Sequence, residues 1–182
     1  MYFSNFPVIF YDSVGNGDIK SVTNLLRRVA VRSKVNTNTM LFDTYDVKSG
    51  ETPESIADKL YDDSELHWVI LLINNVTDRY HDWPLSETQF NAFVNEKYSN
   101  PDGTHHYKIA QSSGDTSITT EVYSNSALYT GDTDSYSSAT IVTNREYEQE
   151  RQDNLRRIRL LDPQYINQFV DEFQKLMKES VI

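Results

Sequence analysis

Apolar residues recur at helical spacing in three stretches in the middle of the chain. In the first, Thr52 is a good N-cap, Pro53 takes the favoured first helical position, and apolar residues follow at positions 56, 57 and 60. A second helix is predicted from a cap at Ser64 to the pair Asn74-Asn75, and because it is apolar on nearly all sides we expect it to be buried. A third helix begins at a capping box over residues 86–89 and carries Phe90, Phe93, Val94 and Tyr98.

Two further helices are predicted towards the C-terminus. Asn144 is expected to cap a highly charged helix that is acidic at its start and basic at its end, as the helix dipole favours. Residues 158–161 are a candidate short strand. The pair Asp162-Pro163 then begins an amphipathic helix whose apolar residues follow the 3.6-residue period: Tyr165, Ile166, Phe169, Val170, Phe173, Leu176 and Met177.

Strand signals lie outside these helices. The alternation over residues 42–47 predicts a strand, and residues 118–123 and 139–143 have high β-propensity. The last two runs belong to a Ser- and Thr-rich segment, which we interpret either as a protruding hairpin or as a partly disordered loop, since composition does not separate the two. The predicted fold class is α+β, with short strands and packed helices. We expect four parts: an aromatic N-terminal arm (1–40), a core with an additional helix (41–100), a β-rich Ser/Thr insertion (101–143) and a C-terminal helical segment (144–182).

The acidic charge is concentrated in the middle of the chain. The 182 residues carry a formal net charge of −10, to which residues 45–144 contribute −11, residues 1–44 contribute +2 and residues 145–182 contribute −1. The acidic stretch is interpreted as a solvated face, with a docking surface for a basic partner as the alternative. The overall sign disfavours nucleic-acid binding. The 12 tyrosines are a composition typical of protein interfaces.

Residue types that carry catalysis or bind metals lack the required spacing. Cysteine is absent, which excludes disulfides and thiolate chemistry. No nucleophile elbow, P-loop, dinucleotide fingerprint or HExxH motif is found. The adjacent His105 and His106 are expected to point to opposite faces of a strand, and the preference of acids for a first helical turn explains the pair Glu51 and Glu54. We therefore expect no enzymatic activity, no cofactor, no metal and no small-molecule substrate.

Membrane and export signals are missing as well. The longest apolar run, residues 68–73, is far too short to span a bilayer. The first ten residues lack the basic n-region and the apolar h-region of a signal peptide. We expect a soluble protein that is made in a cytoplasm.

Residues 45–75 resemble a LysM module. The stretch 45–57 matches the family's opening strand, of the form Y-x-V-x-x-G-[DE]-T, and the start of its first helix, whereas the usual second strand is missing after Asn75. Ten positions carry the resemblance: Tyr45, Val47, Gly50, Thr52, Ile56, Ala57, Leu60, Trp68, Asn74 and Asn75. The core of this module is predicted to form around Ile56, Leu60, Trp68, Ile70 and Leu72. Because LysM modules usually bind N-acetylglucosamine polymers, the resemblance implies a carbohydrate-binding (peptidoglycan) module as one function.

A second family resembles the whole chain, namely the LysM-like baseplate wedge protein (gene product fifty-three) of T-even-type contractile-tailed bacteriophages. This resemblance rests on residues 53–57, 66–75, 82–86, 150 and 155–158, on the length and on the aromatic N-terminus. It implies a structural subunit of the virion, assembled in the host bacterial cytoplasm, that joins neighbouring wedges into a ring around the central hub. The implied partners are other baseplate wedge subunits and neighbouring wedges, with the central hub as a further candidate. We prefer this function, and expect neither binding nor cleavage of peptidoglycan.

The segment 144–177 is predicted to be an element that docks on partner subunits. Its first helix has many charges and only a thin apolar stripe, so it gains little stability from its own domain. The rival interpretation is that both C-terminal helices pack against the N-terminal aromatic residues and belong to the core. The residues expected at the partner interface are Tyr147, Leu155, Ile158, Phe169, Phe173 and Leu176.

Overall fold

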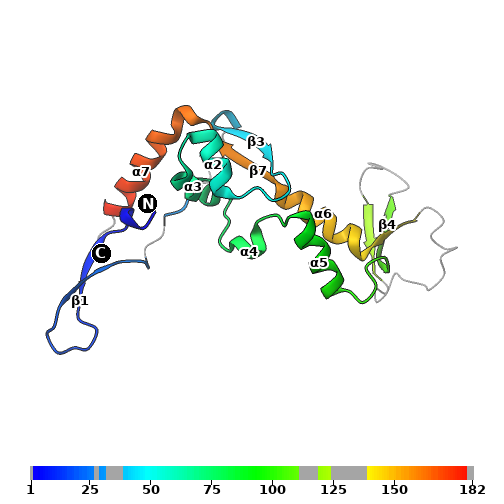
Figure 1. Cartoon of the computed structure of the whole chain (residues 1–182), viewed down its shortest axis with the longest axis horizontal. Helices are drawn as coiled ribbons and strands as arrows, with labels where there is room; N and C mark the ends of the chain where they lie inside the picture. Colours follow the sequence, from blue (N-terminus) through cyan, green and yellow to red (C-terminus); the bar gives the residue numbers. More distant parts are fainter. Residues whose placement is uncertain (1, 27–28, 32–38, 111–118, 124–138, 180–182) are drawn as a thin grey trace. The chain divides into compact units, whose positions relative to one another are not determined.

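Six α-helices and three small antiparallel sheets make up the part of the chain that the computed structural model describes, which is residues 2–26, 29–31, 39–110, 119–123 and 139–179 (Figure 1). The predicted α+β class is therefore confirmed. The chain divides into unit 1, Met1–Trp83 with Arg157–Ile182, and unit 2, Pro84–Arg156. These boundaries do not coincide with those of the four parts expected from the sequence, which stay a prediction. Within the described ranges, no helix combines the length and the apolar character needed to cross a membrane.

Unit 1 contains a two-stranded antiparallel sheet whose strands come from distant parts of the chain. β3 (Phe42–Asp46) pairs with β7 (Arg157–Leu161), so that Tyr45 lies opposite Ile158 (Figure 1). Both strands were predicted individually, and both are confirmed. The helices of this unit are α2 (Pro53–Tyr61), α3 (His67–Ile73) after the 3-10 turn η3 (Ser64–Leu66), α4 (Arg79–Asp82), and α7 (Ile166–Glu179) after the turn η5 (Pro163–Tyr165).

The N-terminal part of unit 1 contributes a second, isolated pair of strands. β1 (Val8–Tyr11) and β2 (Lys20–Thr23) form an antiparallel hairpin in which all eight strand residues are exposed. Two short 3-10 turns, η1 (Tyr2–Asn5) and η2 (Thr39–Leu41), lie before the hairpin and before β3. Phe6, which directly follows η1, is buried in the core of unit 1.

Capping side chains set the helix ends, and two of the predicted caps are wrong. The expected cap of α2 is present, because the Thr52 hydroxyl accepts a hydrogen bond from the Ser55 N–H, and the Ser55 hydroxyl accepts in turn from the Thr52 N–H. Ser64 does not cap the second helix: it begins the 3-10 turn η3, which Asp63 caps by accepting from the Glu65 N–H, and α3 follows at His67 without a side-chain cap. Before the charged helix, it is Thr143 whose hydroxyl accepts from the Glu146 N–H, so that Asn144 is the first helical residue.

Two hydrophobic clusters form the core of unit 1. One joins α3 to α7, with Trp68 and Phe173 at its centre, and the other joins α2 and α3 to the β3–β7 sheet. Of the predicted core residues, Ile56, Trp68 and Ile70 are buried, whereas Leu60 and Leu72 are only half-buried and pack at the margins of these clusters. Because α3 contributes residues to both clusters, it connects α7 with α2 and the β3–β7 sheet.

Unit 2 combines two helices with a three-stranded sheet. α5 (Glu87–Lys97) begins at the predicted capping box of Ser86 and Gln89, and α6 (Asn144–Arg156) is the charged helix. The strands have the order β5-β4-β6, with β4 (Thr104–Ala110) in the centre between β5 (Thr119–Val122) and β6 (Ala139–Thr143). The strand expected at 139–143 is confirmed, and that expected at 118–123 is confirmed over Thr119–Val122; Tyr123 lies beyond the strand, and residue 118 lies outside the described residues. The choice between hairpin and loop concerns residues 111–118 and 124–138, which lie outside the described residues.

Candidate interaction surfaces

The residues of the predicted LysM signature build a turn, a helix cap and a core. Gly50 has a φ of +81°, which L side chains rarely adopt, and thereby allows the turn between β3 and α2. The carboxylate of Glu51, beside it, accepts hydrogen bonds from the Tyr45 hydroxyl at 2.9 Å and from Lys59 Nζ at 2.6 Å. Burial opposes ionisation of Glu51, but these bonds and one from the Lys48 N–H outweigh it and lower its pKa to about 2. The signature thus fixes the junction of strand and helix.

Asn74, at the end of α3, connects the helical part of unit 1 to β7. Its Nδ2 donates to the carbonyl oxygens of Ile70 (2.9 Å) and Arg159 (2.8 Å), and its Oδ1 accepts from the Arg159 N–H (2.8 Å). One side chain therefore satisfies both backbone groups of Arg159 on the edge of β7 that faces away from β3. The Tyr61 hydroxyl adds a bond from α2 to the Leu161 carbonyl at 2.9 Å. These bonds attach β7 to both helices.

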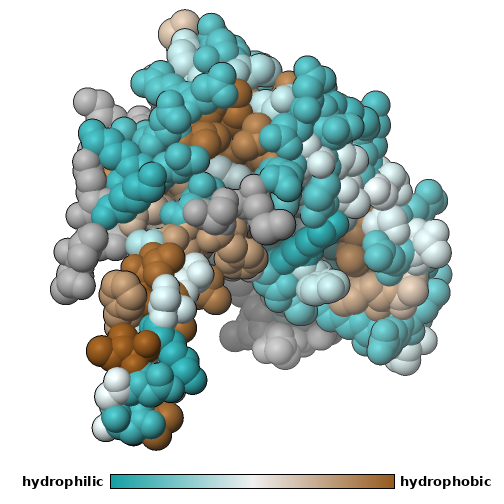
Figure 2. Space-filling view, turned by 60° about the vertical axis from the view of Figure 1, so that its left-hand side comes forward, coloured by the Kyte–Doolittle hydropathy of each residue, from teal (hydrophilic) through white to brown (hydrophobic). Residues whose placement is uncertain are grey.

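The β1–β2 hairpin exposes apolar side chains on both of its faces. Val8 and Phe10 lie on one face, where they are 59% and 80% exposed, and Ile9 lies opposite Val22 on the other. Figure 2 shows hydrophobic residues gathered on this projecting hairpin. The loop between the strands is ordered by the Asp12 carboxylate, which accepts from the N–H groups of Gly15 and Gly17 at 2.7 Å. A large exposed apolar patch on an ordered element is typical of a protein interface.

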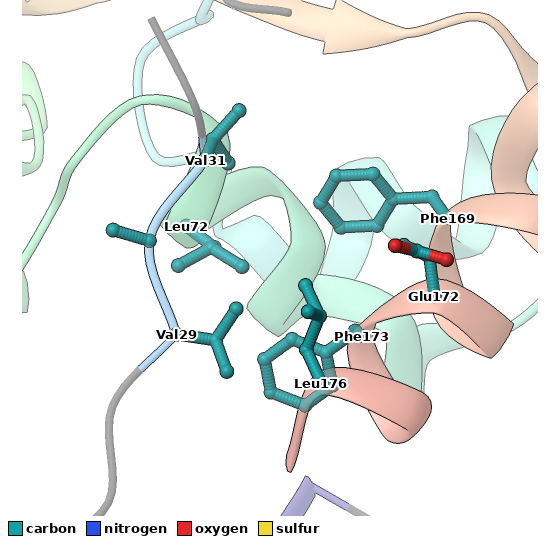
Figure 3. Close-up of a pocket in the computed structure, with 8 residues that line it drawn as sticks. Val29, Val31, Leu72, Phe169, Glu172, Phe173 and Leu176 are labelled. Atoms are coloured by element: carbon teal, nitrogen blue, oxygen red, sulfur yellow. The ribbon is translucent and has the colours of Figure 1, made fainter. Parts of the chain in front are cut away.

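A groove of about 200 Å³ lies between α7 and residues 29–31 (Figure 3). Its walls are apolar, and the side chains of Val29, Leu72 and Phe169 point towards one another across it. Among the described residues that line it, Glu172 is the one with a charge, and it is exposed. The remaining lining residues are Ala30, Val31, Phe173 and Leu176.

Of the six residues predicted at the partner interface, two are buried within the chain and four remain accessible. Ile158 and Phe173 are 4% and 3% exposed within the chain itself, so the expectation that they gain their burial from neighbouring subunits is wrong. The reason is that β7 and α7 complete the core of unit 1, as the rival interpretation held for this part. Phe169 and Leu176 line the groove and remain predicted interface residues. So do Tyr147 and Leu155 of α6, which are both half-buried.

A buried polar network holds unit 2 together, and the sequence did not indicate it. Glu148 of α6 is 1% exposed, and its Oε1 accepts hydrogen bonds from Lys97 Nζ at 2.7 Å and from the Tyr98 hydroxyl at 2.8 Å. Burial raises the pKa of Glu148, but the bonds from Lys97 and Tyr98 outweigh this and lower it. Gln152, one turn later, accepts from the Leu85 N–H at 2.8 Å. Glu148 and Gln152 lie at positions i and i+4 and therefore share one face of α6, but this spacing alone does not indicate that the face is buried.

The two adjacent histidines lie together, contrary to prediction. The register of β4 against β6 shifts between Thr104 and His106, and this irregularity brings His105 Nδ1 to 2.8 Å from His106 Nδ1. The ring of His105 also stacks on Tyr147 at a centroid distance of 3.9 Å. Burial, followed by the proximity of His106, lowers the pKa of His105. In the ranges that the structure describes, no group of three or more His, Asp or Glu residues is placed to hold a metal ion.

Comparison with known proteins finds two matches. A model of the family described as base plate wedge protein 53 matches residues 1–114. The baseplate wedge protein gp53 of Enterobacteria phage T4 is 36% identical over 61 residues, which are 33% of this chain and 31% of that protein. The matched part thus spans about a third of this relative's length.

Proposed function

The chain belongs to the base plate wedge protein 53 family of phages, and from this premise we propose that it joins neighbouring wedges of a tail baseplate into a ring around the central hub. The family consists of structural proteins, so the chain is a non-enzymatic component of the phage tail baseplate, as expected from the sequence. Other baseplate proteins are its partners; the wedge subunits, neighbouring wedges and hub named from the sequence remain part of the proposal.

The observation that carries the proposal is the family match over residues 1–114. The exposed apolar hairpin supports it, because a two-stranded hairpin with apolar side chains on both faces is marginally stable in water and is stabilised when a partner covers it. The groove on α7 offers a second contact on the same unit. Two separate contact surfaces are what a subunit that connects other proteins needs.

We further propose that unit 1 contains a LysM-like core whose second strand is β7. In the sequence, the usual second strand is missing after Asn75, and residues 76–83 follow instead. In the structure, β3 is followed by α2 and α3, and an antiparallel partner for β3 is supplied by residues 157–161. Strand, two helices and strand then occur in the order that the resemblance implies, with unit 2 inserted before the last strand.

The test is assembly in the absence and presence of the chain. Host cells infected with a phage that lacks this gene are expected to accumulate separate wedges, and expression of the intact chain in those cells is expected to restore closed rings in electron micrographs. Closed baseplates in the absence of the chain would contradict the proposal. Saturable binding of the purified chain to peptidoglycan, which we do not expect, would instead support the carbohydrate-binding alternative.

A further inference from the structure

The groove on α7 has the size of an anchor site for one side chain. Its volume of about 200 Å³ lies below the range of about 300–1,000 Å³ that is typical of small-molecule pockets. Interfaces between proteins, in contrast, often depend on one aromatic or aliphatic residue that fills a pocket of this kind. The walls suit such a residue, since α3 contributes Leu72, α7 contributes Phe169, and residues 29–31 contribute Val29 and Val31 (Figure 3).

The charge at the rim specifies the partner further. Glu172 is exposed beside the apolar walls, and no hydrogen bond or ion pair joins its carboxylate to another residue in the described ranges. A carboxylate at the edge of an apolar pocket favours a partner that carries a cation next to its apolar anchor. An acidic or purely apolar partner would leave Glu172 unpaired at the contact.

We propose that this groove binds a segment of another tail protein that inserts one bulky apolar side chain and places a neighbouring lysine or arginine against Glu172. The proposal rests on the proposed function, because it assumes that the chain connects tail proteins. It adds the location of one contact and the chemistry of its partner. The partner is a chain other than this one.

The contact is tested by photo-crosslinking in assembled tails. Ala30 lines the groove and is exposed, so p-benzoylphenylalanine at this position reaches whatever fills the groove. Mass spectrometry of the crosslinked product is expected to identify a peptide of another tail protein with a Leu, Ile, Met or aromatic residue within two positions of Lys or Arg. No crosslink, a crosslink only to this chain, or a peptide without a basic residue would overturn the proposal.

Two matched pairs of variants measure the effect on assembly. Glu172→Lys is expected to reduce ring formation by about tenfold, whereas Asp171→Lys, an exposed carboxylate on the same helix that does not line the groove, is expected to leave it unchanged. Ala30→Trp fills the groove and is expected to act like Glu172→Lys, with Ala92→Trp, at an exposed position of α5, as its control. Exchanging the partner's basic residue for Glu is expected to restore assembly of Glu172→Lys.

The outcomes separate this inference from the proposed function. If the chain is required for ring closure but Glu172→Lys and Ala30→Trp assemble like the unchanged protein, only the groove contact is wrong. If rings close without the chain, the proposed function itself is wrong. Urea unfolding of each variant, followed by far-UV circular dichroism, is expected to match that of the unchanged chain, because both substituted side chains are exposed.

Discussion

Replacing Asn74 by alanine tests whether a single side chain attaches β7 to the helices of unit 1. The substitution removes the two hydrogen bonds that Nδ2 donates and the one that Oδ1 accepts, and it leaves the N–H and the C=O of Arg159 without these partners. A hydrogen bond contributes about 0.5–1.5 kcal/mol net. Because Asn74 is only half-buried, water replaces part of the loss. We therefore expect unit 1 to lose about 2–3 kcal/mol of unfolding free energy.

The two tryptophans make this measurement specific to unit 1. Trp68 and Trp83 are the only tryptophans of the chain, both lie in unit 1, and each is 6% exposed, so urea titration followed by their fluorescence reports this unit alone. Asn74→Asp keeps the acceptor for the Arg159 N–H and is expected to fall between the unchanged chain and Asn74→Ala. The control is Asn75→Gly, since Asn75 has a φ of 55° that glycine adopts freely. If Asn74→Ala is no less stable than this control, Asn74 does not hold β7.

Three further predictions follow from contacts described above. Trp68→Ala removes a buried ring whose centroid is 4.5 Å from that of Phe173 and is expected to lower the free energy of unfolding by about 3–5 kcal/mol. Urea unfolding followed by far-UV circular dichroism measures this, and an unchanged curve would show that the ring does not hold α7. Unit 2 is expected to lose stability as the pH falls below about 6.5, because the pKa of His105 is lowered in the folded state and the unfolded chain therefore takes up the proton first. The measurement is amide exchange of β4, corrected at each pH for the slower intrinsic exchange in acid; protection factors that are equal at pH 7.5 and pH 5.5 would contradict this prediction, and His105→Phe is expected to remove the dependence. Phe10 is exposed, so Phe10→Ser is expected to leave the tryptophan-detected unfolding of unit 1 unchanged but to reduce ring closure in infected cells. Ser13→Ala, at another exposed position, is the control, and normal ring closure of Phe10→Ser would show that this face of the hairpin is not a contact.

Local sequence signals were sufficient to predict the individual helices and strands but not to predict which of them pack or pair with one another. The capping residue Thr52 and the apolar period of residues 165–177 each act within one helix; α2 accordingly forms where predicted, and α7 forms as predicted except that its first residues make the 3-10 turn η5 before Ile166. The pairing of β3 with β7 depends on contacts between residues more than 100 positions apart, such as Tyr45 and Ile158, and no local pattern encodes such a contact. Ile158 was therefore assigned to a partner interface although its partner is the chain itself.

The burial of a charged residue depends on distant contacts in the same way. The first C-terminal helix has many charges and only a thin apolar stripe, and no local pattern distinguishes Glu148 from the other acids of the helix. Glu148 is nevertheless buried, because Lys97 and Tyr98 at the end of another helix satisfy its carboxylate. Whether a charge is buried depends on donors that tertiary structure brings to it, and these donors lie about 50 positions away in the sequence.

The insertion of unit 2 between α4 and β7 also determines the order in which the protein can fold during synthesis. All residues of unit 2 are synthesised before β7 and α7, so unit 2 is complete in sequence earlier than unit 1, although N-terminal parts usually lead. Until then, β3 has no strand partner and Trp68 has no α7 to pack against. A folded unit 2 shortens the effective loop that β7 must close to reach β3. A ribosome that stops after residue 156 therefore releases a chain with a complete unit 2 and a unit 1 that lacks both its second strand and its last helix.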